Sequence, residues 1–170
     1  ERELGKRWRA HFISIDEEPV ATASIAQMHR AVLRDGSPVA LKVRLPSVKR
    51  SFIEDAQSFT LLARWVTPLV KELDVSQIVA QLVQITMEEL DFRREAENLV
   101  RFSRLPHPTS IRVPRLHAEL SSEGLLVTDW EEGRRLREYL DDNPQAASQV
   151  LNLLLGSYLQ QVTRFGFFQA

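Results

Sequence analysis

The first part of the chain alternates short apolar runs with turn residues. The runs begin at Phe12 and are interrupted by acidic residues and a proline at residues 16–19, and by aspartate, glycine, serine and proline at residues 35–38. Runs bounded in this way, here residues 24–33 and 39–45, have the composition and length of strands. The pattern predicts three consecutive antiparallel strands.

Two long helices are predicted to follow these strands. Behind Ser47, a residue type that often caps helices, apolar residues recur at helical spacing, and Pro68 is expected to bend or end this helix. A second helix is predicted from residues 74–76 to about Phe102, because one apolar stripe continues through the segment. The stripe consists of Val79, Leu82, Val83, Thr86, Leu90, Phe92, Ala96 and Leu99.

The remaining residues predict two more strands and two more helices. Residues 112–120 and 124–130 have strand-like composition around a short turn, which makes five strands. Residues 136–140 predict a short helix and residues 145–168 a long one. Because the strands form one block into which helices are inserted, the order predicts an α+β fold with a sheet-containing lobe followed by a helical lobe.

Composition excludes several classes of protein. The 170 residues are 44% hydrophobic and 26% charged, which suits one globular unit. Lysine plus arginine (22) nearly balance aspartate plus glutamate (23), so no nucleic-acid partner is expected. The absence of cysteine excludes disulfides, and no apolar run approaches the roughly 20 residues of a membrane-spanning helix. Because the chain lacks both an initiator methionine and a signal-peptide pattern, we expect a piece of a longer protein.

The strand at residues 39–45 carries the sharpest chemical signal. Its period of two places Val39, Leu41 and Val43 on one face and Ala40 and Lys42 on the other. A small residue beside a lysine suits an ATP site, because adenine lies against the short side chain while the ammonium reaches the phosphates. Taken alone, the pattern fits a surface strand with one solvated lysine better.

Four small residues precede this strand by about one hairpin, at Ala21, Thr22, Ala23 and Ser24. A protein kinase has its glycine-rich phosphate-covering loop at this place, and small side chains let the backbone approach a ligand. Alanine and threonine resist positive φ, so this loop should be stiffer than a glycine loop. Without context, an ordinary turn is the stronger interpretation.

Acidic residues on the second predicted helix offer a partner for the lysine. Glu88, Asp91 and Glu95 would share one helix face, and Lys42 is a candidate counter-ion. The alternative is a merely solvated face, because the arginines Arg93, Arg94 and Arg101 can pair at helical spacing with Glu89 or Glu97.

Together these motifs resemble the AarF/UbiB family of atypical, protein-kinase-like kinases, which includes the kinases of coenzyme Q biosynthesis. Residues 19–31 look like the family's alanine-rich loop and following strand, usually P-x-A-A-A-S-I-A-Q-V-H, although Thr22 replaces an alanine. Residues 39–43 match its strand-lysine motif, and residues 89–96 match its E-x-D helix. The resemblance implies a protein-kinase-like fold with a kinase-like N-lobe at residues 1–128 and a hinge with the start of a C-lobe at residues 129–170.

The resemblance also implies roles for particular residues. Lys42 and Glu95 would be the catalytic ion pair, and Thr128 would be the gatekeeper at the start of the hinge. The nucleotide-binding set that it implies comprises Ala21, Thr22, Ala23, Ser24, Ala40, Lys42, Glu89, Asp91, Thr128, Asp129 and Trp130. Gln27 and His29 belong to the pattern without an assigned chemistry.

The last residues, 165–170, resemble the stretch that leads into the family's D-x-H-P-G-N catalytic loop. The catalytic aspartate and asparagine, the magnesium-binding aspartate and the upstream K-x-G-Q motif are not in this sequence, so no metal ligand is predicted here. We expect the 170 residues alone to be inactive.

The function implied is the ATP-binding part of an atypical kinase or ATPase that supports ubiquinone biosynthesis, with ATP or ADP and Mg²⁺ as ligands. Further implied partners are a lipid or quinone precursor and a membrane surface, with a cytoplasmic location peripheral to the inner membrane through segments outside this sequence. One alternative is a nucleotide-binding pseudokinase that acts as an interaction module. Another is an unrelated α+β domain with a chance set of motifs.

Overall fold

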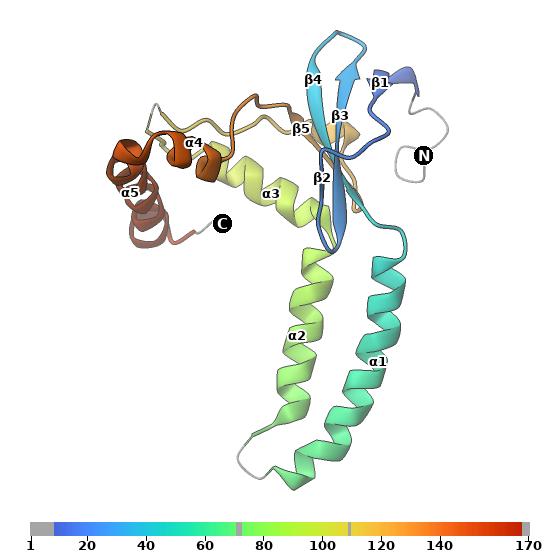
Figure 1. The fold of residues 1–170 in the computed structure, drawn as a ribbon. Coiled ribbons are helices and arrows are strands. Elements are labelled where there is room, and N and C mark those ends of the chain that lie inside the picture. Colours follow the sequence, from blue (N-terminus) through green and yellow to red (C-terminus); the bar gives the residue numbers. More distant parts are fainter. Residues whose placement is uncertain (1–8, 71–72, 109, 168–170) are drawn as a thin grey trace.

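Five strands form a single antiparallel sheet (Figure 1). The computed structural model describes residues 9–70, 73–108 and 110–167. The strand order is β1, β3, β4, β5, and the short β2 also pairs with β3. The strands are β1 (Phe12–Ile15), β2 (Ala21–Thr22), β3 (Ala26–Leu33), β4 (Pro38–Arg44) and β5 (Leu125–Asp129).

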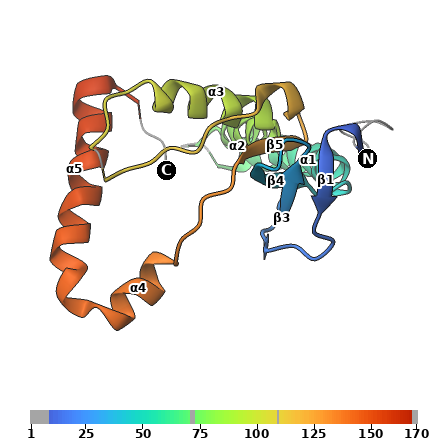
Figure 2. The same ribbon diagram turned by 90° about the horizontal axis from the view of Figure 1, so that it is seen from above.

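The helices extend from this sheet in two directions. The long helices α1 and α2 lie side by side and project away from the sheet, whereas α4 and α5 lie beyond the end of α3 (Figures 1 and 2). None of the described helices is both long and apolar enough to cross a membrane. The α-helices are α1 (Val48–Val66), α2 (Val75–Glu89), α3 (Phe92–Ser103), α4 (Leu136–Asp142) and α5 (Ala147–Phe165), with 3-10 turns at Thr67–Leu69, Ala118–Leu120 and Pro144–Ala146.

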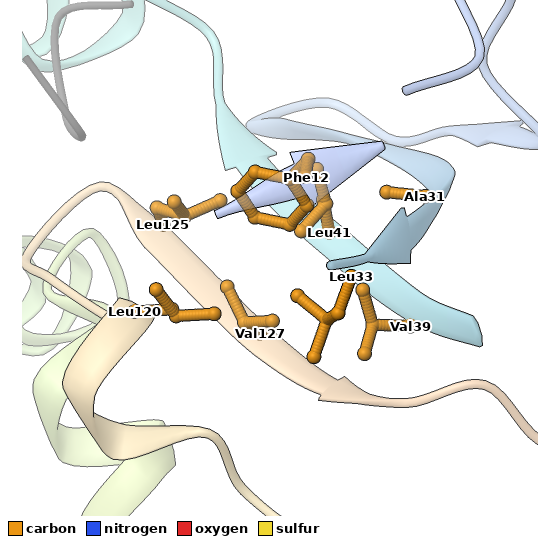
Figure 3. Close-up of a cluster of buried hydrophobic side chains, with 8 residues drawn as sticks. All are labelled: Phe12, Ala31, Leu33, Val39, Leu41, Leu120, Leu125 and Val127. Carbon is orange, nitrogen blue, oxygen red and sulfur yellow. The ribbon is translucent and has the colours of Figure 1, made fainter. Parts of the chain in front are cut away.

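One face of the sheet forms the main hydrophobic core. Alternate residues of β4 and β5 point to this face, and Val39 and Val127 are completely buried there. The opposite strand face displays Ala40 and Lys42, so the predicted two-faced pattern of β4 is confirmed. The core consists of Phe12, Ala31, Leu33, Val39, Leu41, Leu120, Leu125 and Val127 (Figure 3).

A smaller cluster joins α3 to the other face of the sheet. Phe92, at the start of α3, is buried together with Ala26 and Leu126, and Ala96 packs against them from the next turn of the helix. Burying a phenylalanine side chain contributes roughly 1.5–3 kcal/mol. This contact fixes α3 across the face that carries Lys42.

The prediction of a single helix from residue 74 to Phe102 is wrong, because the helix is interrupted at Leu90 and Asp91. The Asp91 carboxylate accepts a hydrogen bond from the Arg93 amide (3.1 Å) and caps a new helix, α3. The Phe92 amide, an orphan donor of that helix, donates to the Glu123 carbonyl (3.0 Å). Contacts with the β5 side of the sheet therefore interrupt a helical pattern that continues in the sequence.

The strand predicted at residues 112–120 is also wrong. Only Leu116 forms a bridge, to Thr128, and a 3-10 turn follows at once. Pro114 has no amide to donate to a ladder, which explains why the pairing stays short. The fifth strand is instead the two-residue β2, inside the segment predicted as a loop.

The other predicted elements are confirmed. The three leading strands correspond to β1, β3 and β4, and the two helices after residue 130 correspond to α4 and α5. Helix α5 ends at Phe165, where Gly166 adopts a φ of 55°, a conformation that glycine tolerates. The predicted continuation to Phe168 lies outside the described residues.

Candidate nucleotide site

Strand register brings the predicted residues of the sheet into two rows. Residues directly opposite each other in a ladder point to the same face. One row runs from Ala21 through Met28 to Lys42, and a neighbouring row joins Ala40 to Thr128. Five residues from four strands thus share the face on which α3 packs.

Lys42 and Glu95 form the predicted ion pair across this face. The Nζ atom of Lys42 lies 2.6 Å from Oε2 of Glu95, and the two side chains are 30% and 35% exposed. The ammonium also lies 4.9 Å from the centroid of the Phe92 ring. A partly exposed ammonium held by one carboxylate still has donors for an anionic ligand. The pair connects the sheet to the first turn of α3.

A cavity of about 170 Å³ lies beside this ion pair. It brings together four of the predicted site residues, Ala40, Lys42, Glu95 and Thr128. The other lining residues are apolar: Met28, Leu99, Pro114 and Leu126. A polar pair at the edge of an apolar pocket is the arrangement in which a flat ring with a charged substituent binds.

The small-residue segment forms a tight hairpin rather than a free loop. The Ala23 amide donates to the Ala26 carbonyl (2.8 Å), so only Ser24 and Ile25 make the turn between β2 and β3. No described residue other than glycine has a positive φ, as expected for a turn without glycine. By register, Ala21 and Ala23 lie on the face of Lys42, whereas Thr22 lies on the other face.

The predicted single acidic face does not form, because the helix break separates its members. Asp91 pairs with Arg93 at 2.7 Å, and hydrogen bonds from Arg93 lower the pKa of the Asp91 carboxyl. Glu88 pairs with Arg94 at 2.8 Å. Arginines therefore neutralise this segment, as the alternative proposed, but their partners are Asp91 and Glu88 instead of the expected Glu89 and Glu97.

Glu89 likewise stands apart from the cavity around Lys42. It is exposed at the C-terminal end of α2, and neither it nor Asp91 lines that cavity. Of the predicted acidic residues, Glu95 is the one that reaches the lysine.

The predicted hinge residues Asp129 and Trp130 are engaged differently from Thr128. The Asp129 carboxylate accepts a hydrogen bond from Nε2 of the buried His117 at 2.8 Å, on the core face of the sheet. The Trp130 indole donates to Glu132 (2.9 Å), and its ring lies 5.3 Å from the Arg30 guanidinium. Their side chains therefore hold the end of β5 in place.

His29, which had no assigned chemistry, has a structural contact. Its Nδ1 atom lies 2.9 Å from the Asp16 carbonyl oxygen and thereby ties the loop between β1 and β2 to β3. It points to the face opposite Lys42, because it pairs with Leu41.

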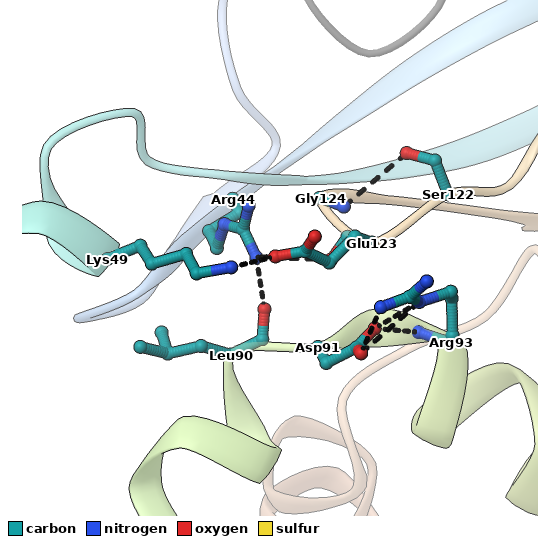
Figure 4. A network of polar contacts seen from close by, with 8 residues as sticks. All are labelled: Arg44, Lys49, Leu90, Asp91, Arg93, Ser122, Glu123 and Gly124. Atoms are coloured by element: carbon teal, nitrogen blue, oxygen red, sulfur yellow. Dashed lines mark hydrogen bonds and ion pairs between the residues drawn. The ribbon is translucent and has the colours of Figure 1, made fainter.

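Sequence reasoning missed a polar network that fixes the chain where α3 begins. Glu123 accepts hydrogen bonds from Lys49 and from Arg44 (3.1 Å), and Arg44 also donates to the Leu90 carbonyl (Figure 4). The Lys49 bond, and after it the Arg44 bond, lower the pKa of Glu123. The network joins β4, α1 and the turn before β5 to the break between α2 and α3. Its single sequence signal, a glutamate in a turn, carries no information about distant partners.

An antiparallel sheet with a lysine on its third long strand, paired to a glutamate on a helix that crosses the sheet, defines a protein-kinase-like domain. The chain matches the ABC1 atypical kinase-like domain over residues 1–170, and it belongs to that family.

Two similar curated proteins are named as kinases. "AarF domain-containing protein kinase 1" of Xenopus tropicalis is 32% identical over 97% of this chain and 32% of its own length. "Atypical kinase COQ8B, mitochondrial" of Rattus norvegicus is 33% identical over 99% of this chain and 32% of its own length. This chain thus spans about a third of the length of these curated relatives.

A solved structure has the same fold. It is the complex of Rv3197 with erythromycin from Mycobacterium tuberculosis, which superposes with a TM-score of 0.72 at 33% identity. The match covers 82% of this chain and 35% of that chain.

Proposed function

We propose that this domain binds ATP on the face of the sheet that carries Lys42, as the front part of an atypical kinase or ATPase. The observation that supports the proposal is the Lys42–Glu95 ion pair of 2.6 Å beside a cavity that Ala40 and Thr128 line. The pair holds the ammonium where it can contact phosphate oxygens, and such charge-assisted hydrogen bonds are about twice as strong as neutral ones.

In the proposed complex, the adenine fills the apolar cavity and the phosphates extend past Lys42. The cavity, at about 170 Å³, is smaller than the roughly 300–1,000 Å³ of most ligand sites, so it suits the ring alone. The side chains of Ala21 and Ala23 share this face: Ala21 lies level with Lys42 in the sheet, and Ala23, opposite Ala26, lies one step further from the hinge. Their short side chains let the backbone approach the phosphates.

The adenine edge would meet the backbone at the end of β5. The Asp129 and Trp130 amides already donate to the carbonyls of Arg115 (2.9 Å) and Pro38 (3.1 Å). Because backbone groups alternate sides along a strand, the Asp129 carbonyl faces away from β4, and the Glu131 amide faces the same way if the extended conformation continues. We therefore assign recognition of adenine to these two groups and leave the amides of Asp129 and Trp130 a structural role.

Mg²⁺ would be held by residues outside this chain, as the family resemblance implies. Among the residues that the structure describes, no three histidine, aspartate or glutamate side chains converge on one point. Mg²⁺ prefers carboxylate and phosphate oxygens, and it would neutralise phosphate charge once bound. This chain's own contribution is to bind and orient the nucleotide.

At the level of the whole protein, we propose a role in ubiquinone or related quinone biosynthesis. The proposal rests on the family and on the relative named COQ8B, mitochondrial. A lipid or quinone precursor and a membrane surface would be the further partners. Residues 1–128 would form the N-lobe and residues 129–170 the hinge with the start of a C-lobe. The alternative is a pseudokinase that binds nucleotide without turnover.

Phosphate release from ATP by the full-length protein tests the proposal. We expect turnover by the wild type and its loss in Lys42→Ala, whereas the 170-residue chain alone should release no phosphate above its own Lys42→Ala control. ATP binding by the full-length protein with no turnover would favour the pseudokinase. Turnover by the 170 residues alone would contradict the assignment of the remaining catalytic groups to other residues.

A further inference from the structure

A second groove lies on the opposite side of α3 from the Lys42–Glu95 pair. It has a volume of about 650 Å³ and is open to solvent between α3 and the segment that leads to β5. Its apolar lining consists of Ala96, Val100, Leu105, Leu116 and Ala118, and Ser121 and Ser122 also line it. Glu97, which lines the groove, lies two residues along α3 from Glu95, or about 200° of helix rotation. The groove and the ion pair are therefore on opposite sides of α3.

Arginines flank this apolar lining. Arg93, Arg101 and Arg104 border the groove at helical spacing, against a single carboxylate from Glu97. Asp91 already holds Arg93 at 2.7 Å, so the charge that a ligand meets comes chiefly from the other two. Positive charge beside apolar side chains complements a ligand that is both acidic and apolar.

Arg101 is ordered for such a contact. Its guanidinium carbon lies 4.3 Å from the centroid of the Phe167 ring, and Phe167 is only 9% exposed. A guanidinium stacked on a ring keeps its N–H edge for a carboxylate, and less side-chain entropy is lost on binding.

The strand-like edge of the groove favours a polypeptide as the ligand. The Arg115 carbonyl accepts from the Asp129 amide and the His117 amide donates to the Val127 carbonyl, both at 2.9 Å. The amide and carbonyl of Leu116, between them, therefore face away from β5. An extended peptide can exchange hydrogen bonds with Leu116 alone, because Pro114 has no amide and a 3-10 turn begins at Ala118, and its side chains can enter the groove beside this point. A flat membrane surface could not reach the apolar lining between a helix and a strand edge.

We propose that this groove docks a partner polypeptide segment that carries large apolar side chains flanked by aspartate or glutamate. The apolar side chains rest on Val100 and Leu116, and the carboxylates pair with Arg101 and Arg104. The site is separate from the nucleotide site, so it stands or falls independently of ATP binding.

Fluorescence anisotropy with the full-length protein tests the groove. The probe is a fluorescein-labelled peptide of about 12 residues with alternating phenylalanines and leucines between glutamates, and the control peptide has lysines in place of the glutamates. We expect the acidic peptide to bind at least about tenfold more tightly than the basic one, because each reversed contact changes attraction to repulsion.

Matched variants locate the binding. Arg101→Glu and Arg104→Glu should each weaken binding of the acidic peptide by about threefold to tenfold. Arg137→Glu, on the exposed face of α4 outside the groove, should change it by less than about twofold. Ala118→Trp fills the groove from an exposed position and should abolish binding while far-UV circular dichroism stays unchanged.

Three outcomes would overturn the proposal. The first is binding that does not respond to Ala118→Trp or to either arginine variant. The second is no peptide binding together with an Arg104-dependent association with vesicles of phosphatidylserine and phosphatidylcholine, which would make the groove a lipid site. The third is no peptide binding together with cross-links from Ala118→Cys to the protein's own chain, which would show an internal segment in the groove.

Discussion

The Glu123 carboxylate shows how one residue can position a site that it does not touch. The carboxylate accepts hydrogen bonds from Lys49 at the start of α1 and from Arg44 at the end of β4. The backbone carbonyl of Glu123 accepts a hydrogen bond from the Phe92 amide. Arg44 is only 13% exposed, so removal of its partner would leave a mostly buried cation. Since Phe92 starts α3, a shift in this network would move Glu95 relative to Lys42.

The pKa of Glu123 predicts acid sensitivity. Its folded-state pKa lies below the ordinary value of 4.5, first through Lys49 and then through Arg44. The unfolded state therefore binds a proton more readily, and the stabilisation from Glu123 is present above about pH 4.5 and lost as the pH falls through the folded-state pKa. Urea unfolding between pH 7 and about pH 3 should show this loss in the wild type, together with the parallel effect of Asp91.

Glu123→Gln isolates the contribution of the network. The variant should be less stable at pH 7 and should lose less stability on acidification than the wild type. Identical slopes of stability against pH in the two proteins would remove Glu123 from this account.

At the scale of elements, the break between α2 and α3 decides which residues belong to the site. Without it, Glu88, Asp91 and Glu95 would share one face, whereas the new helix start turns Glu95 alone to Lys42. Leu90 at the break is almost fully buried, so the chain is anchored where its direction changes. The long pair α1 and α2 is thereby separated from α3, which carries the site.

Two helix caps test whether α2 is separate from the site on α3. Asp91 caps α3 through the Arg93 amide (3.1 Å), and Asp74 caps α2 through the Gln77 amide (3.0 Å). Each change to alanine should lower the free energy of unfolding by about 0.5–2 kcal/mol. In the full-length protein, Asp91→Ala should also weaken ATP binding, because α3 carries Glu95, whereas Asp74→Ala should leave it unchanged. Calorimetry would measure both, and an equal effect on ATP affinity would contradict the separation of α2 from the site.

At the scale of the whole molecule, local patterns predicted most of the fold. The period of two at Val39, Leu41 and Val43 is set by the two faces of the strand and is visible without tertiary information. The apolar stripe from Val79 to Leu99 wrongly predicted one helix. Two residues distant in sequence interrupt it, because Arg44 donates to the Leu90 carbonyl and Glu123 accepts from the Phe92 amide.

The candidate site, like the fold, was predicted from the sequence only in part. Lys42 and Glu95 were predicted from motifs and the family resemblance, because each lies in a regular element of recognisable pattern. The contacts of Asp129 and Trp130, and the groove outside α3, depend on segments that meet only in the folded protein. A single sequence carries no periodic signal for such contacts.

The measurement that tests the central claim most directly is a calorimetric titration of ATP with Mg²⁺ into the full-length protein. Lys42→Ala should bind ATP at least about tenfold more weakly, since charge-assisted hydrogen bonds contribute about 1.5–3 kcal/mol. The matched control Arg50→Ala removes an exposed cation on α1 and should change affinity by less than about twofold. Equal affinity of Lys42→Ala and the wild type would contradict a nucleotide site on this face of the sheet.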